Sequence, residues 1–284
     1  MSALLGALVA ATLSAHAAEA KLHTTHQVGV ALFPEGAQYI FEAEARFPLW
    51  SSDHVLLKDA NVSLIGHAEI TPSFPRVGPV LRISPLAIWD VTLRAYGTWY
   101  FGAFSSLLPF DDPAFPATKA NKRALIDDGV RTGGWGVRFD VETRLKGKAG
   151  PVIAMIELQY RHHEVQSYEG DLTWFWEPTE MINVSATGEV INRNAYLFYE
   201  VVKPRAATEV DPGSDAKLWL GAVGFWQTSP QSGDRNLRLG PVAFWKPAHG
   251  PSWPTIIVGA QAWIESGFAP TFPPYTFAAA SWSR

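Results

Sequence analysis

The chain has 284 residues, a net charge of −4, no cysteine and 12 tryptophans. It contains no run of lysine and arginine, which argues against nucleic-acid binding, because clustered cations are needed to neutralise phosphates. The lack of cysteine excludes disulfides, thiolate catalysis and zinc–thiolate sites, and it is compatible with an oxidising compartment. The length fits one or two globular domains or one closed barrel. We expect a single domain over residues 21–284.

The first 20 residues form an apolar, alanine-rich stretch. Either Ala15–Ala17 or Ala18–Ala20 has the small-x-small pattern that signal peptidase cleaves. The sequence therefore predicts a signal peptide over residues 1–20, with a short N-terminal helix as the alternative. No later window of about 18 apolar residues is present, so any membrane span must be built from β-strands.

Twelve segments of about ten residues follow, in which apolar and polar side chains alternate as they do on the two faces of a strand. They are His26–Phe33, Gln38–Phe47, Ala60–Ile70, Arg76–Ser84, Trp89–Trp99, Trp135–Leu145, Ala154–His163, Ile191–Val202, Lys217–Gln227, Asn236–Lys246, Thr255–Glu265 and Tyr275–Trp282. A tilted strand of roughly ten residues spans a ~25 Å apolar band. The pattern predicts an all-β fold, an antiparallel up-and-down transmembrane β-barrel of about 12 strands.

The segment Trp135–Leu145 shows the alternation most clearly. One face carries Trp135, Val137, Phe139, Val141 and Leu145, and the other carries Arg138, Asp140, Glu142 and Arg144. Successive side chains of a strand point to opposite faces, so one face is apolar and the other is ionic. Lipid outside and water inside match this contrast better than the environment of a soluble sheet does.

The connectors fall into two classes. Residues 84–87, 146–150 and 246–250 are short turns rich in Pro, Gly and Ser, whereas residues 101–130 and 164–189 are long. If both termini of an even-stranded barrel lie in the periplasm, the short turns lie there too and both long loops are outside. Residues 204–215 are long for a periplasmic turn. The stretch Thr173–Ser185 could add a hairpin, which would give 14 strands.

The first long loop contains a helix signature over Thr118–Gly129. Thr118 can cap the N-terminus, a run of helix-forming residues follows, and Gly129 closes it. Because a helix this short is not stable alone, it must pack on something. We expect it to cover the barrel mouth or to fold inward as a constriction, and a poorly ordered loop is the alternative.

Tryptophans lie near many strand ends, where membrane barrels carry interfacial aromatic girdles: Trp89, Trp99, Trp135, Trp226, Trp245 and Trp282. With its leader, alternating strands and two classes of connector, the chain resembles the bacterial outer-membrane β-barrel class over essentially all of its mature length. The resemblance implies an integral outer-membrane location, contact with outer-membrane lipid and insertion by the barrel-assembly machinery. Members of the class typically end on an aromatic residue, whereas here Ser283 and Arg284 follow Trp282.

The polar faces of the strands supply the candidate functional residues. The predicted pore-lining residues are Glu42, Glu44, Arg46, Arg82, Asp90, Arg94, Arg138, Asp140, Glu142, Arg144, Glu157, Arg161, Glu200 and Arg238. Charges of both signs can line an aqueous channel that orients dipolar solutes. They can also pair across a narrow interior and form a salt-bridged plug.

We expect a monomeric, passive channel for small polar solutes. One alternative is a membrane-embedded hydrolase acting on lipids, and another is a closed structural barrel that functions through its long loops. A hydrolase needs a Ser and a His within hydrogen-bond reach, and no strand motif supplies them. His162 and His163 are neighbours on a strand and cannot both bind one ion without a bulge. His67 and Glu69 are interpreted as a satisfied polar pair. No metal, cofactor or catalytic residue is assigned.

Overall fold

The computed structural model describes residues 21–32, 35–103, 106–130, 133–203, 216–248, 253–266 and 274–283. The predicted signal peptide and the connector 204–215 lie outside these residues. No helix in the described part of the chain is long and apolar enough to cross a membrane.

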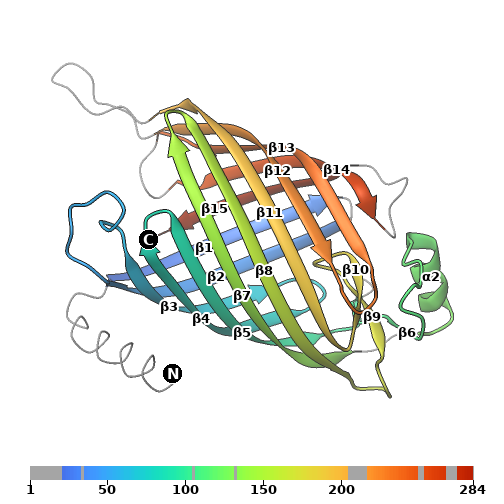
Figure 1. The fold of residues 1–284 in the computed structure, drawn as a ribbon. Coiled ribbons are helices and arrows are strands. Elements are labelled where there is room, and N and C mark those ends of the chain that lie inside the picture. Colours follow the sequence, from blue (N-terminus) through green and yellow to red (C-terminus); the bar gives the residue numbers. More distant parts are fainter. Residues whose placement is uncertain are drawn as a thin grey trace.

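Twelve antiparallel strands form a closed barrel, as predicted (Figure 1). They are β1 (Lys21–Leu32), β2 (Glu35–Pro48), β3 (Asn61–Ile70), β4 (Pro75–Leu86), β5 (Trp89–Tyr100), β7 (Gly134–Ala149), β8 (Val152–Ser167), β11 (Thr187–Val202), β12 (Lys217–Thr228), β13 (Arg235–Lys246), β14 (Thr255–Ser266) and β15 (Tyr275–Ser283). Each strand pairs with its neighbour along the wall, and the first strand closes the barrel by pairing with the last, from Thr25↔Ser283 to Ala31↔Phe277. Closure leaves no unpaired strand edge for lipid to meet.

The faces of the wall follow the two-residue period of the sequence. On β7, Phe139 is 52% exposed on the outer surface, whereas the next residue, Asp140, is 1% exposed inside the barrel. Val141 and Leu145 share the outer face with Phe139. An apolar exterior around an ionic interior is the arrangement that a bilayer requires of a barrel.

The two ends of the barrel differ. The terminal end holds Lys21 and Ser283, together with the tight turns at 87–88 and 150–151. The loop end holds the long connections 101–133 and 168–186. Within these, β6 (Pro109–Phe110), β9 (Trp174–Glu177) and β10 (Ile182–Ser185) form a three-stranded sheet in the order β10–β9–β6.

The 14-strand alternative is therefore wrong for the wall. The extra hairpin does form, as β9 and β10, but each strand has four residues, which is too short to cross the membrane. The hairpin pairs with β6 at the loop end instead.

The helix predicted at Thr118–Gly129 forms as α2 (Lys119–Asp127). The Thr118 hydroxyl caps it by accepting a hydrogen bond from the Asn121 N–H at 3.2 Å. None of its residues is fully buried, although Lys122 is partly covered, and Figure 1 shows the helix beyond the loop end. The segment that fills the interior is the small sheet, not the helix.

Candidate functional site in the barrel lumen

The sheet of β6, β9 and β10, called here the inserted sheet, is packed inside the loop end of the barrel. An apolar cluster joins it to inward side chains of the wall: Leu107, Phe175, Ile182 and Val184 from the two long loops, and Phe74, Tyr100, Val165 and Val190 from the wall and its turns. Leu107, Ile182 and Val184 are completely buried. Burial of this many apolar side chains fixes the sheet in the mouth of the barrel.

Polar contacts attach the inserted sheet to the turn between β12 and β13. The Asp234 carboxylate accepts a hydrogen bond from the Asn183 N–H at 2.8 Å, and the Ser232 hydroxyl donates to the Asn183 carbonyl at 2.7 Å. The Asn183 amide donates to the Phe115 carbonyl at 2.7 Å, so it also links the two long loops. Burial raises the pKa of Asp234 above its usual value.

Backbone strain is concentrated in the same two loops. Leu107 has a φ of 52° and Met181 a φ of 58°, and they are the only described non-glycine residues with positive φ. A bulky residue adopts this conformation only where its surroundings hold it there. Both side chains are buried in the clusters that the inserted sheet forms, which supply that restraint.

The helix α2 contacts the outer side of the inserted sheet through Lys122. Its ammonium lies 4.0 Å from the centre of the Trp176 ring. Burial, with a smaller effect from Lys119, lowers the pKa of Lys122 to about 8. The cation is therefore held on an aromatic face at the cost of part of its hydration.

The turn between β9 and β10 projects Glu180 towards the middle of the lumen. Its carboxylate forms an ion pair with Arg161 of β8 and accepts a hydrogen bond from the Gln227 amide of β12 at 2.5 Å. The Asn236 amide of β13 donates to the Glu180 carbonyl at 3.1 Å. One residue of the inserted sheet is thus bound to three wall strands.

Arg161 belongs to a layer of charges across β7 and β8. Its guanidinium lies 3.3 Å from Asp140, which is also bound by Arg138 at 2.5 and 2.7 Å. Asp140, Arg161 and Glu180 are all buried. Opposite charges at these distances offset each other's loss of hydration.

A second layer lies nearer the terminal end. Arg144 binds Glu157 at 2.7 Å and Glu142 at 3.0 Å, and Arg94 binds Glu142 at 2.8 Å. At the terminal end itself the pairs involve more exposed cations, Arg46 with Glu44 at 3.0 Å, Lys146 with Asp90 at 2.9 Å and Lys148 with Glu200 at 2.7 Å. Arg82 lies 3.9 Å from Glu44.

His67 occupies a separate polar cluster on β2, β3 and β4. It lies 3.0 Å from Glu42 and 4.0 Å from Glu69, and Arg76 binds Glu69 at 3.1 Å. The pair of His67 and Glu69 is satisfied, as expected from the sequence.

All 14 predicted pore-lining residues are on strands of the wall, and 13 of them have a partner of opposite charge or, for Glu42, the His67 ring. Arg238 differs, because it lies against the rings of Phe225, Trp263 and Tyr275 and near Gln227. Sequence reasoning missed Glu180, Arg76, Lys146 and Lys148. The last three continue the alternation of their strands, whereas Glu180 lies in a turn without periodicity.

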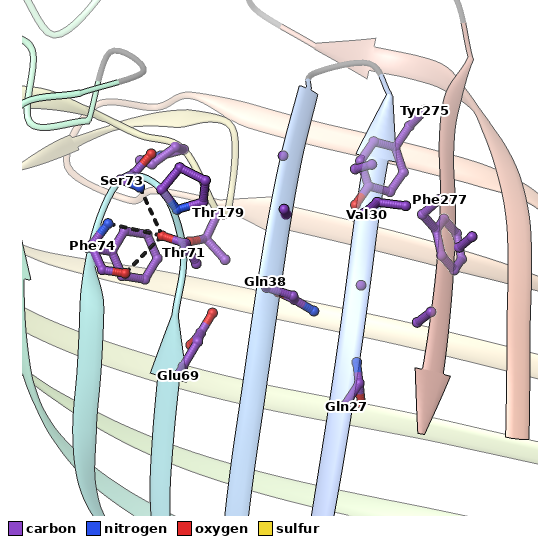
Figure 2. A pocket seen from close by; sticks show the side chains of 18 of the residues that line it. Gln27, Val30, Gln38, Glu69, Thr71, Ser73, Phe74, Thr179, Tyr275 and Phe277 are labelled. Atoms are coloured by element: carbon purple, nitrogen blue, oxygen red, sulfur yellow. Dashed lines mark hydrogen bonds between the residues drawn. The ribbon is translucent and has the colours of Figure 1, made fainter. Parts of the chain in front are cut away.

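Two cavities flank the buried charge layers. A cavity of about 1100 Å³ at the terminal end, the terminal chamber, is lined by charged residues that include Arg46, Arg82 and Lys146. A cavity of about 500 Å³ at the loop end, the loop-end pocket, lies between β1, β2, β14, β15 and the turn of the inserted sheet (Figure 2).

Closed 12-stranded architecture, an apolar exterior and an ionic interior together decide the class. This chain is a transmembrane β-barrel. No family model matches the sequence, and no curated protein matches it. Two solved structures are similar along most of the chain. The translocator domain of the autotransporter NalP from Neisseria meningitidis is 10% identical, with 99% of this chain and 95% of that chain covered and a TM-score of 0.37. OmpT, an outer-membrane protein of Vibrio cholerae, is 8% identical, with coverages of 93% and 99% and a TM-score of 0.36.

The described residues contain no cluster of three His, Asp or Glu that could hold a metal ion. His163 points inward, 2.8 Å from the Ser185 carbonyl, while His162 is on the outer face near Glu164. A serine hydrolase pairs an imidazole with a serine hydroxyl. Among the described residues, no histidine ring is hydrogen-bonded to the side-chain hydroxyl of a serine or threonine.

Proposed function

We propose that the protein is a passive outer-membrane channel for small polar solutes, with the inserted sheet as its narrowest part. The observation that carries the proposal is the terminal chamber, a cavity of about 1100 Å³ whose charged lining continues into the layers at Arg144 and Arg161. A row of paired charges gives a polar solute hydrogen-bonding partners along its path without a single strong binding site. An even number of strands puts both ends of the barrel wall at the terminal end, and in this proposal that end faces the periplasm, as in bacterial barrels, while the loop end faces outward.

The close pairing of charges bears on the size of the solute. Asp140, Arg161 and Glu180 are buried and Arg138 is partly buried, and ion pairs connect the four, so this layer constricts the lumen. The conductance of the resting barrel is therefore small, and displacement of the inserted sheet would widen the lumen and increase the conductance.

Single-channel recording in a planar bilayer tests the proposal. We expect small ohmic steps from the native protein and larger steps from Glu180→Ala, because this change removes the contacts of the inserted sheet with Arg161 and Gln227. Glu169→Ala is the matched control, since Glu169 is exposed in the same long loop. Silence from the native protein and from Glu180→Ala, with both folded, would overturn the proposal.

A second function is favoured by one observation, the apolar packing of the inserted sheet in the mouth. A barrel closed in this way could act through its outer loops alone. Silent bilayers together with unchanged folding would support this function.

A further inference from the structure

The loop-end pocket differs from the rest of the interior because its walls are largely apolar. The space for the pocket is left by small residues on the inner face of the wall. Gly29 and Ala31 of β1 face Gln38 and Gly36 of β2, and Ala279 of β15 is paired with Gly29. The apolar lining is completed by Phe277 of β15 and by Met181 from the turn of the inserted sheet. At about 500 Å³, the pocket is within the size range of small-molecule sites.

The polar groups of the pocket are few and neutral or already satisfied. Thr71 is committed to its own turn, accepting from the Phe74 N–H at 3.0 Å and donating to the Phe74 carbonyl at 2.9 Å (Figure 2). The Glu69 carboxylate is bound to Arg76 at 3.1 Å. Among the described residues, the side-chain amides of Gln27 and Gln38 have no hydrogen-bonding partner, and both line the pocket.

We propose that the loop-end pocket binds an uncharged, largely apolar small molecule that carries one hydrogen-bonding group. The apolar walls favour the body of such a molecule, and an amide can both donate to and accept from its polar group. A charged molecule is disfavoured, because the lining offers no unpaired ion to offset the loss of hydration. The inference rests on the pocket and not on conduction, so it stands if the barrel proves silent in bilayers.

Because the chain lacks cysteine, Ala279→Cys places a single thiol in the pocket. The rate at which N-ethylmaleimide alkylates this thiol measures access to it. We expect 2-naphthol, an uncharged aromatic alcohol, to slow alkylation about tenfold at roughly ten times its Kd. Naphthalene-2-sulfonate, which has the same ring system and a negative charge, should leave the rate unchanged.

Two glycine substitutions provide matched variants. A Cβ added at Gly36 or at Gly66 meets nothing within 4 Å, so Phe fits at either position without a clash at its first atom. Gly36 lines the pocket, whereas Gly66 is exposed on β3. In the Ala279→Cys protein, Gly36→Phe should abolish protection by 2-naphthol and Gly66→Phe should preserve it. Gln38→Leu should weaken protection about fivefold, by the loss of one hydrogen bond.

Folding of each variant is checked by the heat-dependent shift of the barrel on gels. If Gly36→Phe fails to fold, Ala31→Leu fills the same wall from β1. No effect of 2-naphthol on alkylation, equal protection by the sulfonate, or full protection in a folded pocket-filling variant would overturn the proposal. Conductance of the same variants is recorded separately, so that failure of binding and failure of conduction are distinguished.

Discussion

Removal of the Glu180 side chain should release the inserted sheet while leaving the barrel wall intact. The change removes the ion pair with Arg161 and leaves the Gln227 amide, which donates to Glu180 at 2.5 Å, without this acceptor. Breaking one partner of a buried ion pair costs about 3–5 kcal/mol. Arg161 keeps its contact with Asp140 at 3.3 Å, so we expect the lower end of this range, about 3 kcal/mol, for Glu180→Ala.

The loss should appear as local opening, because the wall strands are held by their own ladders and by lipid. Limited proteolysis of the folded protein measures it directly. About 3 kcal/mol raises the open population about 150-fold, so cleavage within residues 168–186 should accelerate by a similar factor. The Glu169→Ala control should be cleaved at the native rate.

A double variant separates the ion pair from simple loss of packing. Replacing a buried pair by apolar side chains of similar volume is often neutral, so Arg161→Met with Glu180→Met should be cleaved more slowly than Glu180→Met alone. Asp140 keeps Arg138 as its partner in this variant. Native cleavage rates in Glu180→Ala, or a double variant no better than the single one, would refute this account of how the sheet is held.

Three further outcomes follow from the wall and from α2. Phe139→Lys on the lipid face near the midplane should cost about 2–4 kcal/mol of folding free energy, whereas Leu22→Lys, at the end of β1, should cost about 0–1 kcal/mol. Folding free energies in lipid bilayers are measured by urea titration, and equal losses in the two variants would contradict the assigned depths. Arg138→Glu with Arg144→Glu turns two paired layers acidic and should lower the unfolding temperature, and unchanged stability would show that water screens these layers. Because the pKa of Lys122 is lowered to about 8, packing of its charged form against Trp176 costs folding free energy; this cost is full below about pH 8 and disappears as the pH rises towards 10.5. The pH dependence of amine labelling at Lys122 should therefore have its midpoint near pH 8. A midpoint near 10.5 would show that the contact with Trp176 is not formed in solution.

The wall of the barrel could be predicted from the sequence because it obeys a period of two. Trp135 to Leu145 alternate over the full length of a strand, and a one-residue error in register would have placed Asp140 in lipid. Strand ends differ by a few residues, as in β7, which runs from Gly134 to Ala149. The alternation also assigned Arg138 and Asp140 to one face, where they form a pair.

The contents of the lumen could not be predicted in the same way. Glu180 gains its partners from β8, β12 and β13, whose nearness depends on the closed barrel and not on local spacing. The hairpin at Thr173–Ser185 could be recognised in the sequence, but its position could not, since the side-chain pattern of a four-residue strand does not indicate which surface it packs against. The helix was recognised by the cap at Thr118, and its exposed position depends on the inserted sheet having taken the interior.

The position of the inserted sheet has a consequence for the order of folding. Its strands come from the connections between β5 and β7 and between β8 and β11, so the sheet and the four wall strands that carry these connections form one continuous piece of chain, residues 89–202. The seam joins β1 to β15, and the Thr25 and Ser283 hydroxyls that meet there are 258 residues apart. Closing so long a loop is entropically costlier than pairing neighbours. We expect the central hairpins to enclose the sheet first and the seam to join last, so that the barrel closes around contents already in place.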